Sequence, residues 1–295
     1  MPSTTLSLPT PRPFELRLCL FGHGWIDLPP HAYDEATETF STVLQLGNQS
    51  IDAVVRPGGR GTLALRLDSR RRLGPRQREE AGRQIRHALR LDDDLTGFHA
   101  LCRSEPGLRW VARRGAGRLL RSPTVFEDLM KLLLTTNTSW AGTRAMTRNL
   151  VEACGEPSPS GRRGFPAPDQ CLRDARWFRD VVRAGYRAEG ALQLARKFAE
   201  STLDDDTFLR PQPTTELRER LLSLRGFGPY AAGQAMRLFG HYEELAIDSW
   251  CRARLAELAS SKRPPSDRAI ARRYAKFRPF QGLALWMDLT AEWHG

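Results

Sequence analysis

Apolar and polar side chains alternate with a period of two over much of the first seventy residues, which is the pattern of half-buried β-strands. The runs are separated by turn signals, Gly47-Asn48 and the glycine-rich stretch at 56–61. The pattern predicts four antiparallel strands, at 14–20, 42–46, 51–55 and 63–67.

The period changes to that of a helix after this predicted sheet. From Gln77 the residues Ala81, Ile85 and Leu89 recur at a spacing of four, which predicts an amphipathic helix. The acidic run at 92–94 predicts the cap of a further short helix through Leu101, because a short carboxylate accepts the free amide hydrogens of a first turn.

The second half carries almost no strand signal. It follows a basic, glycine-containing stretch at 113–118, which we interpret as a linker, and the segment at 152–169 is predicted to be an exposed loop. Helices are predicted after Pro123 and at about 188–201, 214–224, 229–238, 250–258, 267–276 and 281–292. We therefore expect an α+β protein, with an N-terminal antiparallel β-sheet domain and flanking helices at 1–112 and an all-helical domain at 113–295.

Composition narrows the class of protein. The 295 residues include 45 Lys+Arg and 34 Asp+Glu, a net charge of +11, with 40% hydrophobic residues. This hydrophobic content is that of a folded protein, and the charge favours a polyanionic partner, either nucleic acid or an anionic membrane surface. No run is long and apolar enough to predict a membrane span, and the N-terminus resembles no secretory signal. The five scattered cysteines indicate neither a disulfide framework nor a zinc or iron–sulfur ligand set, so we expect a cytoplasmic location.

The most informative string is Leu224-Arg225-Gly226-Phe227-Gly228-Pro229-Tyr230-Ala231. An apolar helix ends there, two glycines allow a sharp turn, and Pro229 begins the next helix. Such a turn presents backbone amides beside a helix N-terminus, where an anion such as a DNA phosphate binds. An ordinary connection between two helices explains the glycines equally well.

Asp248 follows twenty residues after Gly228, at the end of an apolar run and at the start of a predicted helix. The common role of Asp at this position is that of a plain N-cap. The functional alternative places its carboxylate in a cleft beside the hairpin.

Together these strings resemble the helix-hairpin-helix DNA glycosylase superfamily, in which a Gly-x-Gly hairpin precedes a catalytic Asp by about this distance. Three further segments resemble the superfamily: 123–140, which is similar to the helix and loop that probe the duplex, Gly185-Tyr186-Arg187-Ala188, and Phe277-Arg278-Pro279-Phe280. The preceding sheet is similar to the branch that holds 3-methyladenine DNA glycosylase II and 8-oxoguanine DNA glycosylase. The resemblance implies a partner, double-stranded DNA with a damaged base, and makes a membrane partner less plausible; we expect a monomer.

The resemblance implies that Asp248 stabilises an oxocarbenium-like sugar and positions water while the N-glycosidic bond of a flipped-out base breaks. Bifunctional members carry a lysine where this chain has Tyr230, which cannot form an imine, so we expect a monofunctional enzyme without lyase activity. The DNA-binding residues implied are Asn137, Arg225, Gly226, Gly228, Tyr230 and Ala231.

Aromatic residues suggest the substrate. A cationic alkylated base is held by stacking and cation–π attraction, for which the candidates are Tyr230, Trp250, Trp286 and Trp177. Helical spacing also explains Trp286, with Leu285, Leu289 and Trp293, as core, and for any single one of these the core is the simpler explanation. Packing at the second hairpin helix is the alternative for Tyr230. The absent lysine, and Leu285 where the 8-oxoguanine enzymes have a polar residue, favour alkylated over oxidised bases. The alternatives are an 8-oxoguanine-type glycosylase and a non-catalytic damage-binding protein.

The resemblance also bears on cofactors. None is expected to be required, and the iron–sulfur cluster of one branch is not expected because no cysteine cluster follows the helical domain. The family's hairpin commonly binds a monovalent cation through backbone carbonyls, here those of Leu222, Leu224 and Phe227.

Overall fold

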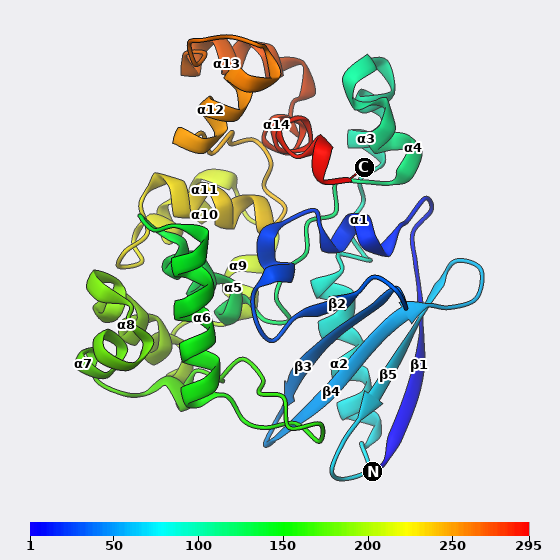
Figure 1. Cartoon of the computed structure of the whole chain (residues 1–295), viewed down its shortest axis with the longest axis vertical. Coiled ribbons are helices and arrows are strands. Elements are labelled where there is room, and N and C mark those ends of the chain that lie inside the picture. Colours follow the sequence, from blue (N-terminus) through cyan, green and yellow to red (C-terminus); the bar gives the residue numbers. More distant parts are fainter. Residues whose placement is uncertain (295) are drawn as a thin grey trace.

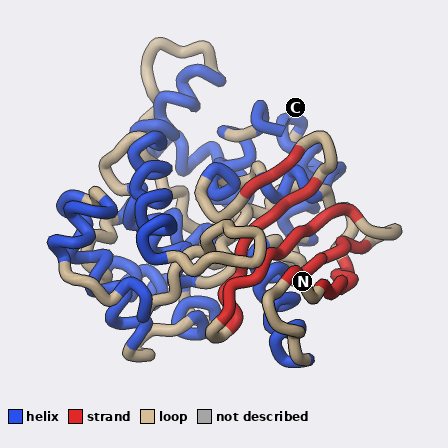
Figure 2. Tube along the Cα trace, turned by 60° about the horizontal axis from the view of Figure 1, so that its bottom comes forward, coloured by secondary structure: helices blue, strands red, loops and turns tan. Residues whose placement is uncertain are grey.

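The computed structural model describes residues 1–294, which form an antiparallel sheet at one side of a larger set of helices (Figures 1 and 2). The sheet has five strands in the order β1-β5-β4-β3-β2. Their bounds are β1 Ser3–Pro9, β2 Ala32–Asp34, β3 Thr39–Leu46, β4 Gln49–Pro57 and β5 Thr62–Asp68. The predicted α+β class, with the sheet preceding the helices, is confirmed.

The helices of the first part are α1 Leu16–Leu20, α2 Pro75–Ala88, α3 Thr96–Ser104 and α4 Arg109–Arg114. Those of the second part are α5 Val125–Thr135, α6 Trp140–Cys154, α7 Ala175–Trp177, α8 Ala188–Ala199, α9 Asp205–Leu209, α10 Thr214–Leu222, α11 Pro229–Leu238, α12 Ser249–Leu258, α13 Asp267–Tyr274 and α14 Gln281–Leu289. In residues 1–294 no helix has both the length and the apolarity needed to cross a bilayer.

The predicted strand at 14–20 is wrong. Residues Leu16–Leu20 form the short helix α1, in which Leu16, Leu18, Cys19 and Leu20 are all buried. A run of five residues that is buried on several sides cannot be assigned from its period, because no polar face is left to mark it. The strands β1 and β2 were not predicted; β1 lies at the sheet edge and pairs with β5, for example Leu6 with Leu65.

The segment predicted as an exposed loop at 152–169 is irregular only after α6 ends at Cys154, and it is not simply exposed. Asp52 on β4 accepts hydrogen bonds from the hydroxyls of Ser158 and Ser160, each at 2.7 Å. A Cβ placed on Gly164 lies 3.0 Å from a methyl carbon of Val43 on β3. The segment therefore covers the centre of the sheet.

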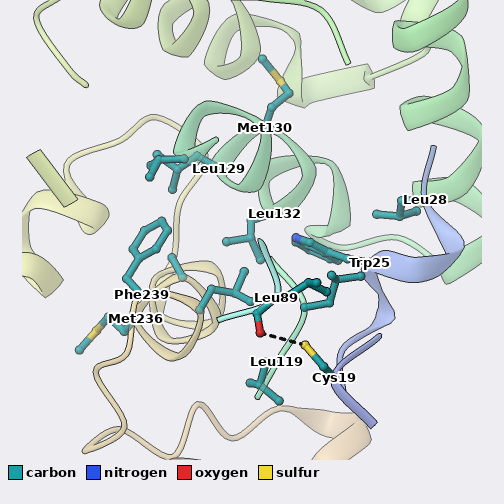
Figure 3. Packing of buried hydrophobic residues seen from close by; sticks show 14 of the residues in the cluster. Cys19, Trp25, Leu28, Leu89, Leu119, Leu129, Met130, Leu132, Met236 and Phe239 are labelled. Carbon is teal, nitrogen blue, oxygen red and sulfur yellow. Dashed lines mark hydrogen bonds between the residues drawn. The ribbon is translucent and has the colours of Figure 1, made fainter. Parts of the chain in front are cut away.

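A single cluster of buried apolar side chains runs through the sheet and the helices. Figure 3 shows the part of it around Leu129 and Leu132 of α5, where the Cys19 thiol donates to the Leu89 carbonyl oxygen at 3.3 Å. Arg118, from the stretch interpreted as a linker, is only 4% exposed and donates to the Asp93 carbonyl at 2.8 Å. The helices that carry the candidate site are thus anchored to the sheet.

Candidate active site

Of the two glycines in the turn between α10 and α11, only Gly226 is required by the backbone geometry. Gly226 has φ +90°, and a Cβ there would lie 2.5 Å from Cδ1 of Leu133 on α5. Gly228, the N-cap of α11, has ordinary extended angles and open space around it. Phe227 is buried between them and its amide donates to the Leu224 carbonyl at 3.0 Å. Gly226 and Gly228 are exposed, so the backbone of the turn is open to a ligand from solvent.

The position of Asp248 is compatible with both roles considered for it, that of a helix cap and that of a carboxylate in a cleft. Its Oδ1 accepts the Cys251 amide at 2.7 Å and caps α12. Its Oδ2 accepts a hydrogen bond from no residue in 1–294, and Asp248 lines a cavity of about 1000 Å³. A cap that uses one oxygen fixes the carboxylate and leaves the other oxygen for chemistry.

The cavity also gathers the other predicted residues. Tyr230, Trp250 and Trp286 line it together with Asn137, Gly226, Gly228 and Ala231. Arg225 lies outside the cavity wall on the exposed turn, and Trp177 lies elsewhere, packed on Phe178 with ring centroids 5.2 Å apart. Trp177 therefore does not belong to the pocket.

Tryptophans form one wall of this cavity. The rings of Trp250, Trp286 and Trp293 have mutual centroid distances of 5.9, 5.9 and 6.0 Å. Trp286 is 9% exposed and its indole nitrogen donates to the Gly22 carbonyl at 2.7 Å. The wall offers flat surfaces on which a base can stack.

Another part of the cavity wall comes from the N-terminal half and was missed in the sequence. The segment 21–27 follows α1 and includes the 3-10 turn Gly24–Asp27. It lines the cavity with Phe21, His23, Gly24, Trp25, Ile26 and Asp27. Trp25 donates to the Asp128 carboxylate at 2.7 Å, and Trp140 donates to that of Asp27 at 2.9 Å. The string Gly22-His23-Gly24-Trp25 was a local signal of a loop, but not of its partner helices.

Asn137 lies at the cavity mouth with φ +44°. Its side-chain amide donates to the Tyr186 hydroxyl at 3.1 Å, and Arg187 donates to its carbonyl at 3.2 Å. The loop after α5 and the Gly185–Ala188 segment, which were singled out separately in the sequence, therefore contact each other directly.

No family model matches the chain. A DNA-3-methyladenine glycosylase of Bacillus subtilis (strain 168) is 26% identical over 165 residues, and the match spans about half of each protein (54% and 54%). Among solved structures, a 3-methyladenine DNA-glycosylase from Archaeoglobus fulgidus superposes with TM-score 0.75 at 18% identity, covering 98% of this chain and 99% of that one. The chain has the fold of the helix-hairpin-helix DNA glycosylases.

A second branch of this glycosylase fold is nearly as similar. The Clostridium acetobutylicum 8-oxoguanine glycosylase/lyase in its apo form superposes with TM-score 0.71 at 16% identity, covering 97% of this chain and 95% of that one. The resemblance inferred from the hairpin and Asp248 is confirmed by these neighbours, which come from both branches named for it.

Charges around the cavity are set by burial in this glycosylase fold. Burial, and then Arg237, lowers the pKa of His23 to about 3, so this cavity-lining imidazole is neutral at pH 7. Burial, and then the Asp248 carboxylate, raises the pKa of Tyr230, which keeps its phenol protonated. His23 and Tyr230 therefore line the cavity as neutral groups.

The predicted cation ligands lie in the hairpin turn. The Leu224 carbonyl accepts the Phe227 amide, whereas no backbone amide in residues 1–294 donates to the Leu222 or Phe227 carbonyl within the turn. These free oxygens are the kind of donor that a monovalent cation takes, so the residues fit the site and the cation stays a prediction.

Proposed function

We propose that this protein is a DNA glycosylase that hydrolyses the N-glycosidic bond of an alkylated or oxidised base in double-stranded DNA. One observation carries the proposal: Asp248 has one oxygen fixed by its helix cap and the other free, in an aromatic cavity beside an exposed hairpin. The names of the similar proteins, which are 3-methyladenine and 8-oxoguanine glycosylases, support it.

In this mechanism the damaged nucleotide leaves the stack and its base enters the cavity that the tryptophans and the loop at 21–27 line. The backbone amides of the hairpin hold a phosphate, and Asn137 occupies the space left in the duplex. The base leaves with the electron pair of the N-glycosidic bond, and an uncharged base takes up a proton from solvent as it leaves. The Asp248 carboxylate stabilises the positive charge that develops on the sugar and accepts a proton from the attacking water. A cation on the hairpin carbonyls would add positive charge beside the phosphate.

We further propose that the enzyme is monofunctional. Lyase chemistry needs an amine that attacks the sugar, and no lysine in residues 1–294 lines the cavity. Lys131, the lysine of α5, is fully buried and donates to Glu127 at 2.6 Å. Tyr230 stands at the hairpin position where the lyases have their nucleophile.

The test is base release. Duplexes with a single alkylated or oxidised base are incubated with the protein, free base is measured by chromatography, and the strand is examined before and after alkali. We expect free base, strand breaks only after alkali, and activity that persists with a chelator. Absence of base release from every duplex, with binding retained, would favour the damage-binding alternative. A covalent adduct trapped with borohydride would overturn the monofunctional assignment.

A further inference from the structure

Gln234 lies on α11, one helical turn beyond Tyr230, and both side chains line the cavity. The residue is only 6% exposed, and its Nε2 group donates a hydrogen bond to no residue in 1–294 while this nitrogen stays accessible to water. A base that fills the cavity displaces that water, and leaving the donor without a partner then costs about 1–3 kcal/mol. The cavity therefore favours a bound base that can accept a hydrogen bond from Gln234.

Arg237 fixes which end of this amide faces the cavity. Its Nη1 donates to Gln234 Oε1 at 2.8 Å, and its Nη2 donates to the Leu245 carbonyl at 2.9 Å. A guanidinium group has only donors, so the amide cannot flip and present its nitrogen to Arg237. Gln234 Nε2 is thereby turned away from Arg237.

Arg237 also changes the charge of the cavity wall. It is 2% exposed, and its guanidinium carbon lies 4.8 Å from the ring centroid of Trp286. The electron-rich face of that ring is already used by a cation, and a second cation stacked on Trp286 would be repelled. Asp27 also lines the cavity, but it is exposed and its charge is screened by water.

The lowered pKa of His23 shows that these surroundings disfavour a positive charge. Its ring lies 5.7 Å from that of Trp286, and burial together with Arg237 holds the pKa of this imidazole at about 3. A cationic base on the same platform meets the same low polarity and the same guanidinium. The Asp248 carboxylate opposes this effect, but Arg237 lies close enough to offset part of its charge.

Resting on the glycosylase function proposed above, we propose that Gln234, oriented by Arg237, is a specificity-determining residue that selects an uncharged damaged base presenting a carbonyl oxygen. Gln234 Nε2 donates to that oxygen, while Arg237 disfavours bases that carry a positive charge. This differs from the cationic alkylated base expected from the sequence. The sequence did not reveal that the Arg237 guanidinium packs against the ring of Trp286.

Two matched pairs of duplexes test the wild-type protein. Hypoxanthine and unsubstituted purine differ in the carbonyl group at C6. 8-Oxoguanine and 7-methylguanine share that carbonyl and differ in charge, together with the oxygen at C8 and the methyl group at N7. Single-turnover rates are divided by the spontaneous rate of each duplex, because cationic bases are intrinsically labile. We expect at least about tenfold larger rate enhancement for hypoxanthine than for purine, and for 8-oxoguanine than for 7-methylguanine.

The variant Gln234→Glu keeps the bond to Arg237 but replaces the donor with an acceptor and adds negative charge. We expect it to lower both ratios at least about tenfold, while Gln193→Glu on α8, outside the cavity, leaves them unchanged. Ratios near one in the wild type, or ratios unaffected by Gln234→Glu, overturn the inference while leaving the glycosylase intact. Absence of release from all four duplexes instead overturns the proposed function. If the variant melts at low temperature, the wild-type ratios still decide.

Discussion

Replacement of Asp248 by Asn separates the two roles of this residue. Asn is as good an N-cap as Asp, so its side-chain oxygen can still accept the Cys251 amide that lies 2.7 Å from Oδ1. We expect the free energy of unfolding to change by less than about 0.5 kcal/mol. The substitution removes only the negative charge from the cavity.

The loss of that charge should be visible in the chemical step. Electrostatic stabilisers of a transition state are worth about 10²–10³ in rate, or roughly 3–4 kcal/mol of activation free energy. We therefore expect base release in single turnover to fall by this factor in Asp248→Asn. Binding to the damaged duplex should be retained or slightly tighter, because one negative charge near the phosphates is gone.

Asp174→Asn is the matched control. Asp174 caps α7 in the same way, with its Oδ1 accepting the Trp177 amide at 2.6 Å, and it lies outside the cavity. Base release is measured by chromatography and folding by thermal melting for both variants. Release by Asp248→Asn within about threefold of the wild type, at unchanged stability, would refute the role of the carboxylate.

Four other substitutions probe the hairpin, the buried charges and the DNA surface. Gly226→Ala should destabilise the protein by about 1–3 kcal/mol in chemical denaturation because of its positive φ and the contact with Leu133, whereas Gly228→Ala should have little effect. Burial raises the pKa of Asp128 to about 6, so the folded state binds its proton more tightly than the unfolded state. The stability of wild type relative to Asp128→Asn should therefore rise, by up to about 3 kcal/mol, as the pH falls from 7 to 4; a flat difference would contradict this. Arg225→Ala should reduce the salt dependence of DNA binding by about one unit of slope in a filter or anisotropy titration, and an unchanged slope would remove Arg225 from the phosphate contacts.

The parts of the site that were predictable are those encoded locally. The Gly226–Gly228 turn and the Asp248 cap each depend on a few consecutive residues, so their types and spacing were visible in the sequence. The wall at 21–27 was not, because it meets α5 and α14 only through long-range contacts such as Trp25 with Asp128.

In the sheet, too, only locally encoded elements could be predicted from the sequence. Strands β3 and β5 were predicted because apolar residues alternate at 42–46 and 63–67, and β4 because the run 51–55 lies between clear turns. The helix α1 was mistaken for a strand because burial on several sides left no polar face to set its period. The charge of Arg237 against Trp286 was also out of reach, since the two residues are 49 positions apart in the chain.

Five of the seven tryptophans of the chain, Trp25, Trp140, Trp250, Trp286 and Trp293, line the cavity. The intrinsic fluorescence of the protein is therefore dominated by the site itself, without any introduced label. Entry of a base against these indoles should quench the emission, whereas docking of an undamaged duplex on the hairpin should leave most of it unchanged. Stopped-flow emission can thus resolve in time the arrival of DNA, the extrusion of the nucleotide and the departure of the free base.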